Sequence, residues 1–529
     1  MDVRRLVLGT GVAILLLAGG LPVAALAARA FQAGTGAGPF PGLPASPREW
    51  TLLGNSLLLA ALTSAGAMIA GVPAAFLVAR TDLPGRRALA AVLTLPLLLP
   101  PYLTAAGWLA AGSPSGPVAR LVGRPAAAAL AEALQGLPGT VLVLATAFAP
   151  LVMLLTAAAL AGLPGRLEEA GLITAPRRTV LRRITLPLVA PAAGLGASLA
   201  FLLALGEVTV APALRFPVYA VEILTRFAAF YDIDAAVVAA VPLALVTAVV
   251  LAGETFLARR TGLVGLRGGR AGPPPPRYAL GTARTPAALA AWAVTATLAG
   301  VPLAVLVLRA GGPASYADAL AQAGGSLVRG LALAAASGTL LAAEGFVLAV
   351  LVLESPGLPA RAVDAAALFL FALPGAVLGV GLIVLWNHPW AGIVTGTPAI
   401  LLLGHLAHGS AVTLRLSRSA LALVPAGLVE AARTAGAGWG RRLVWILAPV
   451  ARRGILAAWL AGAVLALRDV GMTLLVHPPG WDTLPVRIMT LSANGSPGTI
   501  AALCVLLAAV TAVPLAAIAG LLGGAGATR

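Results

Sequence analysis

Apolar stretches long enough to cross a lipid bilayer recur along the whole sequence, and they exclude most folds. A helix of about 18 or more apolar residues covers the roughly 30 Å of membrane hydrocarbon. Only 10% of the 529 residues are charged and the mean hydropathy is +0.98, which is more apolar surface than a soluble domain can bury. The alternating segments of about 10 residues that build a membrane barrel are absent. The sequence therefore predicts an all-α polytopic membrane protein.

We expect about twelve transmembrane helices. The first has a rival interpretation, because its basic start and small-residue end also fit a cleaved signal peptide. Its apolar part is longer than that of a usual signal peptide, which favours a retained helix. The predicted ranges are 6–28, 51–79, 88–112, 139–163, 188–206, 236–258, 286–309, 327–353, 362–386, 396–417, 453–475 and 498–522.

The positive charges are all arginine, because the 35 basic residues include no lysine. Most of them fall at the termini and in loops on one side of the predicted helices, as the positive-inside rule requires of cytoplasmic segments. We therefore expect a multi-pass protein of the bacterial plasma (inner) membrane, with both termini cytoplasmic, that contacts membrane lipid and no nucleic acid. A Walker A loop needs a lysine, so conventional ATP hydrolysis would require another polypeptide. The single cysteine, Cys504, excludes internal disulfides and cysteine-rich metal sites.

The chain divides into two similar halves. Residues 259–285 are rich in Gly, Pro and Arg and include four consecutive prolines, which is typical of a stiff linker. Glu168 and Glu430 are 262 positions apart (430 − 168), and the same offset relates Pro187 to Pro449 and Glu207 to Asp469. This common offset indicates duplication and fusion with both halves in one orientation. The predicted parts are a first helix and outer segment (1–50), a first bundle (51–258), a cytoplasmic linker (259–285), a seventh helix and outer segment (286–325) and a second bundle (326–522).

Two charged stretches interrupt the apolar chain at matched places, between the fourth and fifth predicted helices of each half. We call LEEAGLITAPRRTVLRRITLPL (167–188) the first polar stretch and LVEAARTAGAGWGRRLVWILAPV (428–450) the second polar stretch. Glutamate favours a helix N-terminus, alanine allows close approach, and Gly436 would let the backbone turn into a second short helix. This pattern is typical of a short cytoplasmic helix that lies in a groove of a partner. One such stretch alone could be a solvated basic loop, but two at one offset favour docking.

The two polar stretches resemble the EAA motif of permease subunits in binding-protein-dependent ABC importers. That motif reads E-A-A, then Gly at the sixth position after the Glu, then I-x-L-P at the sixteenth to nineteenth. The second stretch departs only at Ala448, whereas the first departs at Glu169 and at Thr174, where the family has Gly. The matching residues are Glu430, Ala431, Ala432, Gly436, Ile446 and Pro449 in the second stretch, and Glu168, Ala170, Ile184, Leu186 and Pro187 in the first.

The resemblance covers about residues 50–260 and 326–522, and it implies two tandem six-helix permease halves of type I. In that family the motif forms the coupling helix that docks on a cytoplasmic ATPase. It implies two ATP-binding cassette ATPase subunits that bind ATP and Mg, and an extracytoplasmic solute-binding protein. No catalytic residue, metal or cofactor is expected on this chain. The implied ATPase-coupling residues are Glu168, Glu169, Ala170, Thr174, Glu430, Ala431, Ala432 and Gly436.

Two further segments resemble fused ferric-iron importer permeases. They are LPLLLPPYLTAAGWLA (95–110) and LRDVGMTLLVHPPGWDTLPVRIMTL (467–491). Fused thiamine and phosphonate importers share these features. Ferric iron is therefore the expected substrate, with thiamine, phosphonate or another small solute as the alternative.

Three acidic residues are candidates for a pathway or gate. Glu344 falls inside a predicted helix, where a charge is costly unless it faces protein or water; the alternative is a protonated or paired structural residue. Glu207 and Asp469 end predicted helices near the outer face. They could line an outer vestibule, or they could be interfacial helix ends, where a charge costs little. His405 and His408 share one face of a helix, and we expect packing or hydrogen-bonding groups rather than metal ligands.

Two other functions compete with an ABC importer. A secondary transporter with two parallel halves predicts uptake driven by an ion gradient and paired carboxylates in the membrane. A membrane scaffold that docks an ATPase predicts binding of that ATPase without substrate flux. The doubled polar stretches are unexplained by the first of these, and no other element of the chain resembles a signalling domain.

Overall fold

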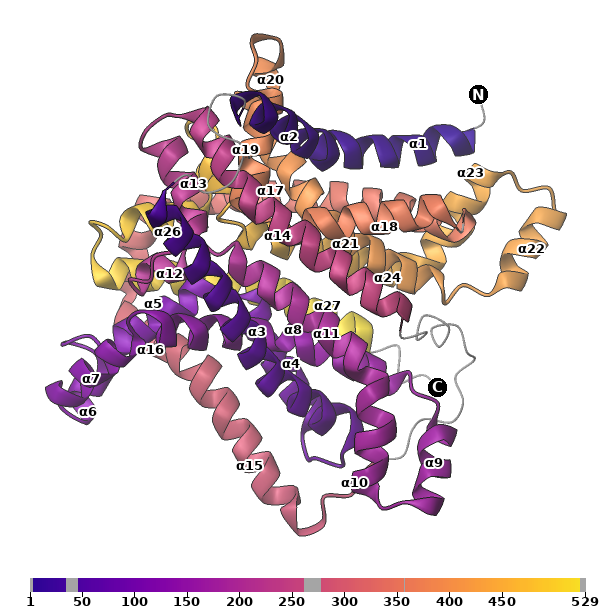
Figure 1. The fold of residues 1–529 in the computed structure, drawn as a ribbon, viewed down its shortest axis with the longest axis horizontal. Helices are drawn as coiled ribbons and strands as arrows, with labels where there is room; N and C mark the ends of the chain where they lie inside the picture. The colour runs from indigo at the N-terminus through magenta and orange to yellow at the C-terminus, as the bar shows by residue number, and fades with distance from the viewer. Residues whose placement is uncertain (1–2, 35–45, 261–276, 356, 524–529) are drawn as a thin grey trace. The chain divides into compact units, whose positions relative to one another are not determined.

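The computed structural model describes all residues except 1–2, 35–45, 261–276, 356 and 524–529 (Figure 1). The described part of the chain is helical, with no β-strand and one isolated parallel bridge between Thr81 and Tyr278. Ten of its helices are long and apolar enough to span a membrane, or up to twelve if each of two bent pairs is one span. The predicted all-α polytopic membrane fold is confirmed. Most of the predicted linker, 259–285, lies outside the described residues.

The chain forms two compact units that do not coincide with the two sequence halves. Unit 1 is Met1–Pro44, Glu222–Ala244 and Gly312–Arg529, and unit 2 is Ala45–Val221 and Leu245–Gly311, in each case for the described residues. Two helices, α13 (Tyr219–Ala228) and α14 (Ile233–Arg260), pass from one unit to the other.

Unit 2 contains a bundle of three long helices and several short ones. Its helices are α3 (Pro47–Arg80), α4 (Arg86–Leu98), α5 (Pro101–Ala111), α6 (Pro117–Leu121), α7 (Arg124–Leu134), α8 (Leu137–Ala161), α9 (Gly165–Thr174), α10 (Arg177–Val180), the π-helix η2 (Leu181–Thr185), α11 (Leu186–Leu205), α12 (Val210–Ala213), η4 (Gly281–Ala283), α15 (Arg284–Thr295), the π-helix η5 (Ala296–Gly300) and α16 (Val301–Ala310).

Unit 1 contains a similar series of helices from α17 to α25, preceded by a helix with a π-helical turn. Its helices are α1 (Val3–Leu15), the π-helix η1 (Leu16–Gly20), α2 (Leu21–Gly34), α17 (Pro313–Glu354), α18 (Leu358–Ala372), α19 (Gly375–Trp386), η6 (Pro389–Ala391), α20 (Gly392–Thr395), α21 (Ala399–Leu421), α22 (Ala426–Thr434), α23 (Trp439–Arg442), the π-helix η7 (Leu443–Leu447), α24 (Ala448–Arg468), α25 (Thr473–Val476), α26 (Leu484–Leu491) and α27 (Pro497–Gly523).

The third predicted helix of each half is bent. The pair α4 and α5 turns by 92° and the pair α18 and α19 by 107°. Leu99 and Leu373 stand at these breaks in extended conformations, with ψ of 140° and 132°, and each precedes a proline. A residue before proline avoids the α conformation, and proline cannot donate the next helical hydrogen bond. The prediction of continuous helices at 88–112 and 362–386 is therefore wrong in detail. The predicted helix 453–475 also ends earlier, at Arg468.

The first helix of each sequence half packs in the unit built from the other half. In unit 1, α2 packs on α19, and a Cβ added at Gly381 would lie 2.9 Å from the carbonyl oxygen of Pro22. In unit 2, α16 packs on α5, and a Cβ at Gly107 would lie 2.7 Å from the Cα of Pro302. Gly107 and Gly381 are 274 positions apart (381 − 107), so the two contacts are repeat-related. The halves thus exchange their first helices.

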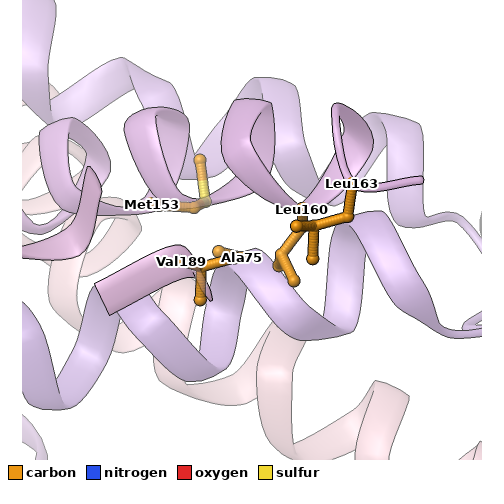
Figure 2. Close-up of a cluster of buried hydrophobic side chains, with 5 residues drawn as sticks. All are labelled: Ala75, Met153, Leu160, Leu163 and Val189. Carbon is orange, nitrogen blue, oxygen red and sulfur yellow. The ribbon is translucent and has the colours of Figure 1, made fainter. Parts of the chain in front are cut away.

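Small residues let the long helices of each bundle approach closely. In unit 2 a Cβ at Gly71 of α3 would lie 2.6 Å from the carbonyl oxygen of Ala149 in α8. In unit 1 a Cβ at Gly345, again 274 positions later, would lie 2.6 Å from the carbonyl carbon of Thr413 in α21. Such glycine contacts are typical of helix packing in membranes. Figure 2 shows the apolar cluster that continues this packing in unit 2, which contains Ala75, Met153, Leu160, Leu163 and Val189.

Candidate functional site

The two polar stretches fold in the same order of elements. In the first, α9 leads through a turn into α10, the π-helix η2 and the long helix α11. In the second, α22 leads into α23, the π-helix η7 and α24. The π-helices begin at Leu181 and Leu443, which are 262 positions apart (443 − 181). A π-helix is rare and frequently marks a functional site, so its recurrence at one offset supports a shared role.

The turns between the short helices differ, as the sequences do. Gly436 has a φ of +78°, and its N–H donates to the carbonyl oxygen of Arg433 at 3.0 Å. The N–H of Ala437 donates to the carbonyl oxygen of Ala432 at 2.9 Å, which closes α22 with a left-handed glycine cap. The first stretch has Thr174 in place of this glycine. Its helix instead ends at Ala175, in an extended conformation before Pro176.

Most of the predicted coupling residues lie on the surface. Ala432 is partly buried, and Glu168 is the exception, with 1% of its surface exposed. Apolar side chains lie beside them in sequence, including Ile173 at 85% exposure in the first stretch and Leu428 at 45% in the second. The exposed predicted residues are Glu169, Ala170, Thr174, Glu430, Ala431 and Gly436. An acid beside exposed apolar side chains on a short helix is suited to a complementary groove.

Glu168 is held inside unit 2 by two partners that the sequence did not indicate. Its carboxylate forms an ion pair with Arg80, the last residue of α3, and both side chains are 1% exposed. The Thr185 hydroxyl donates to Oε1 of Glu168 at 2.7 Å. Arg80 also donates to the carbonyl oxygen of Leu160 at 3.3 Å, and its guanidinium lies 5.7 Å from the ring centre of Tyr278. An arginine that ends an apolar helix is expected from the positive-inside rule alone, so no sequence signal singled it out.

Glu207 and Asp469 hold the turn that follows a long helix. Oε1 of Glu207 accepts from the N–H of Val210 at 3.1 Å and from Thr209. Oδ2 of Asp469 accepts from the N–H of Thr473 at 2.9 Å and from its hydroxyl at 2.6 Å. The two carboxylates therefore satisfy backbone donors at the starts of α12 and α25, as capping residues do. Their repeat-related positions reflect a repeated break in the fold.

A buried polar group connects α17 and α21 in unit 1. The Ser410 hydroxyl donates to Oε2 of Glu344 at 2.9 Å, and the Ser337 hydroxyl lies 2.9 Å from Nδ1 of His405. Nε2 of His408 lies 3.0 Å from the carbonyl oxygen of Leu373, and its Nδ1 lies 3.8 Å from Asp469. In the described residues no group of three or more His, Cys, Asp or Glu could hold a metal ion. The histidines thus make hydrogen bonds between helices.

A charged contact joins the first half of α17 to the segment before α26. Asp482 accepts from the Ser326 hydroxyl at 2.8 Å and forms an ion pair with Arg329. Burial alone would raise the pKa of Asp482, but the hydrogen bonds from Ser326 and Arg329 and the charges of Arg329 and Arg487 hold it below its ordinary value. The contact fixes the segment before α26, outside the membrane-spanning helices.

Comparison with known proteins shows partial matches to permeases. The protein named "Putative 2-aminoethylphosphonate transport system permease protein PhnV" of Salmonella typhimurium is 31% identical over 140 residues, which are 26% of this chain and 52% of that protein. The "Probable molybdenum ABC transporter permease protein" of Haloferax volcanii is 31% identical over 154 residues, 29% of this chain and 54% of that protein. The chain spans about half the length of these relatives. No protein-family model matches it. Over part of its length, the chain is thus similar to transport permeases, one of them of ABC type.

Proposed function

We propose that this chain is the transmembrane permease subunit of an ATP-driven ABC importer, with both permease halves fused. The observation that carries the proposal is the pair of polar stretches, which repeat a short exposed helix, a turn and a π-helix at one offset of 262 positions. Each stretch places an exposed acid and exposed apolar side chains on a short helix, which is the form of an element that docks in a partner's groove. The similarity to permease proteins supports the same role.

In this proposal the polar stretches lie in the cytoplasm and each contacts one ATPase subunit. The ATPases bind ATP and Mg, and their closure moves α9 and α22 and, through the π-helices, the long helices α11 and α24. The bundle then opens to a substrate delivered by an extracytoplasmic solute-binding protein. This chain binds no cofactor and catalyses no covalent step. Glu207, Asp469 and Glu344 are proposed pathway or gate residues because they lie at helix breaks or inside a bundle.

Ferric iron is the proposed substrate, on the resemblance of residues 95–110 and 467–491 to ferric-iron importers. The name of the Salmonella relative favours a second candidate, a phosphonate such as 2-aminoethylphosphonate. Uptake of radiolabelled ferric iron and of 2-aminoethylphosphonate by cells with and without the gene separates the two. Loss of iron uptake alone supports the first, and loss of phosphonate uptake alone supports the second.

A different class of function also has an observation in its favour. The Glu344, His405 and His408 group places titratable side chains inside unit 1, as an ion-gradient-driven transporter would require. That function leaves the repeated polar stretches unexplained, so we place it second.

The test of the permease proposal is purification of the tagged chain from native membranes with identification of co-purifying proteins. The parallel sample carries Glu168→Ala and Glu430→Ala together. A P-loop ATPase that accompanies the wild type and is lost from the double variant supports the proposal. Absence of any ATPase from the wild-type sample contradicts it.

A further inference from the structure

The first acid of each polar stretch has a different environment. Glu168 is buried in an ion pair with Arg80 and accepts a hydrogen bond from Thr185. Glu430, at the repeat-related position, lies exposed on α22 and has no ion pair with any described residue. The two motif positions therefore cannot present the same group to a partner.

This difference follows from the residues that surround each acid. Arg80 ends α3, and the residue 274 positions later (354 − 80) is Glu354, which ends α17. Glu354 is an acid where unit 2 has a base, and it accepts hydrogen bonds from Arg4 at 2.9 Å and from the indole of Trp439 at 3.0 Å. The counterpart of Thr185 is Leu447, which has no side-chain donor. Unit 1 thus lacks both groups that hold Glu168 in unit 2.

A described segment of the predicted linker, around Tyr278, lies against the buried pair. The N–H of Tyr278 donates to the carbonyl oxygen of Arg80 at 2.7 Å, and the carbonyl oxygen of Tyr278 accepts from Asp82 at 3.4 Å. The Tyr278 ring lies 5.7 Å from the guanidinium of Arg80 and 6.0 Å from that of Arg177 in α10. Arginine over an aromatic ring is stabilised by a cation–π interaction. One cluster therefore ties α9 and α10 to the end of α3.

The first stretch carries a second acid directly after the buried one. Glu169 is exposed on α9 and, like Glu430, forms no ion pair with any described residue. The corresponding residue of the second stretch is Ala431. The doubled acid of the first stretch is thus explained if one carboxylate is used inside the unit and the other remains on the surface.

Building on the permease function proposed above, we propose that Glu169, and not Glu168, is the acid of the first polar stretch that contacts an ATPase subunit. Glu168 is a positioning residue that holds α9 against α3, and Glu430 is the contacting acid of the second stretch. The partner surface that fits both is an apolar groove with a basic rim, because each exposed acid has exposed apolar side chains beside it in sequence. Glutamate occupies both motif positions, Glu168 and Glu430, but its role differs between them.

The positioning role is tested by the thermal stability of the detergent-solubilised chain. Glu168→Gln and Arg80→Gln should each lower the unfolding midpoint by about 5 °C or more, because each leaves a buried charge unpaired. The double variant should lose less than the sum of the two. Thr185→Ala is a milder change that should lower the midpoint less. The matched controls Glu169→Gln and Glu430→Gln should leave it unchanged. Additive losses, or a loss in the controls equal to that of Glu168→Gln, overturn the assignment.

The contacting role is tested by maleimide labelling in inside-out vesicles. Single cysteines replace Glu169 or Glu430 in a Cys504→Ala background, where the acid of the other stretch and the exposed apolar side chains beside the cysteine still hold the ATPase. Vesicles are compared before and after urea removes peripheral proteins. Both cysteines should label severalfold more slowly before the wash. Adding Glu168→Gln should abolish protection at position 169 and preserve it at position 430, which a general loss of stability would not do.

The outcomes separate this inference from the function on which it rests. Protection at position 430 without protection at 169 overturns the role of Glu169 and leaves the permease proposal intact. No protection at either position contradicts the permease proposal itself, and the positioning role of Glu168 is then decided by the stability measurements alone.

Discussion

The packing of α16 on α5 predicts that a side chain at Gly107 destabilises the protein. Gly107 of α5 faces Pro302 of α16, and a methyl group there would lie 2.7 Å from the backbone carbon atoms of Pro302. Ordinary van der Waals contact begins at 3.4 Å, and the carbonyl oxygen of Pro302 lies closer still, so α16 must retreat by at least about 0.7 Å (3.4 − 2.7) to accommodate Gly107→Ala. Overpacking of this kind costs about 1–3 kcal/mol.

The control variant removes a competing effect. Alanine is favoured over glycine inside a helix by about 1 kcal/mol, which would mask part of the clash. Gly54 of α3 has no atom within 4 Å of an added Cβ. Gly54→Ala therefore gains the higher helix propensity of alanine without a steric clash. The difference in stability between the two variants therefore isolates the overpacking cost.

The assay measures the unfolding midpoint of the solubilised chain, and size-exclusion chromatography of a fluorescent fusion monitors the unfolding. Gly107→Ala should unfold several degrees below Gly54→Ala. Gly381→Ala, where the added Cβ would meet Pro22 at 2.9 Å, should fall between them. Equal midpoints for Gly107→Ala and Gly54→Ala would show that α16 does not pack on α5 in this way.

Three further predictions follow from single contacts. Gly436→Val should destabilise α22 by about 1–2 kcal/mol and impair ATPase coupling, because a side chain is strained at a φ of +78°. Thr174→Gly should have little effect on coupling. The stimulation of ATPase activity in the assembled complex measures the coupling of each variant. The pKa of Asp482 is lower in the folded state than its ordinary value of 3.8. Its stabilising contribution should therefore be complete above pH 3.8 and be lost as the pH falls through the folded-state pKa. Unfolding midpoints measured over a pH series should show this loss in the wild type and not in Asp482→Asn. Glu344→Gln should preserve stability because the amide oxygen still accepts from Ser410, whereas Ser410→Ala should destabilise unit 1 by about 1–3 kcal/mol; equal midpoints for the two variants would contradict the buried hydrogen bond.

The sequence predicted the helices well and their breaks poorly. Apolar length located every candidate span, because bilayer thickness fixes it. The bends at Leu99 and Leu373 were missed although each residue precedes a proline, since proline is tolerated within membrane helices and does not by itself mark a break. The exchange of first helices could not be predicted, because it depends on which bundle offers the glycine that admits each helix.

The candidate site was predicted as a sequence pattern but not as a surface. Gly436 was recognised correctly as a turn residue, since the left-handed conformation strongly favours glycine. The burial of Glu168 was missed because its partner, Arg80, lies 88 positions earlier (168 − 80), and a terminal arginine has an adequate topological explanation. The replacement of Arg80 by Glu354 at the repeat-related position was also missed. These two residues are 274 positions apart, as the packing glycines are, whereas the polar stretches are 262 positions apart.

In the proposed function ATP, and not an ion gradient, drives transport through this chain. The direct measurement is accumulation of labelled ferric iron, and of 2-aminoethylphosphonate, in proteoliposomes that contain the purified complex. ATP and Mg are supplied on the ATPase side, the solute-binding protein on the other, and no ion gradient is imposed. Accumulation that requires ATP and is reduced by Glu430→Ala is the predicted result. Accumulation driven by a proton or sodium gradient without ATP would contradict the account.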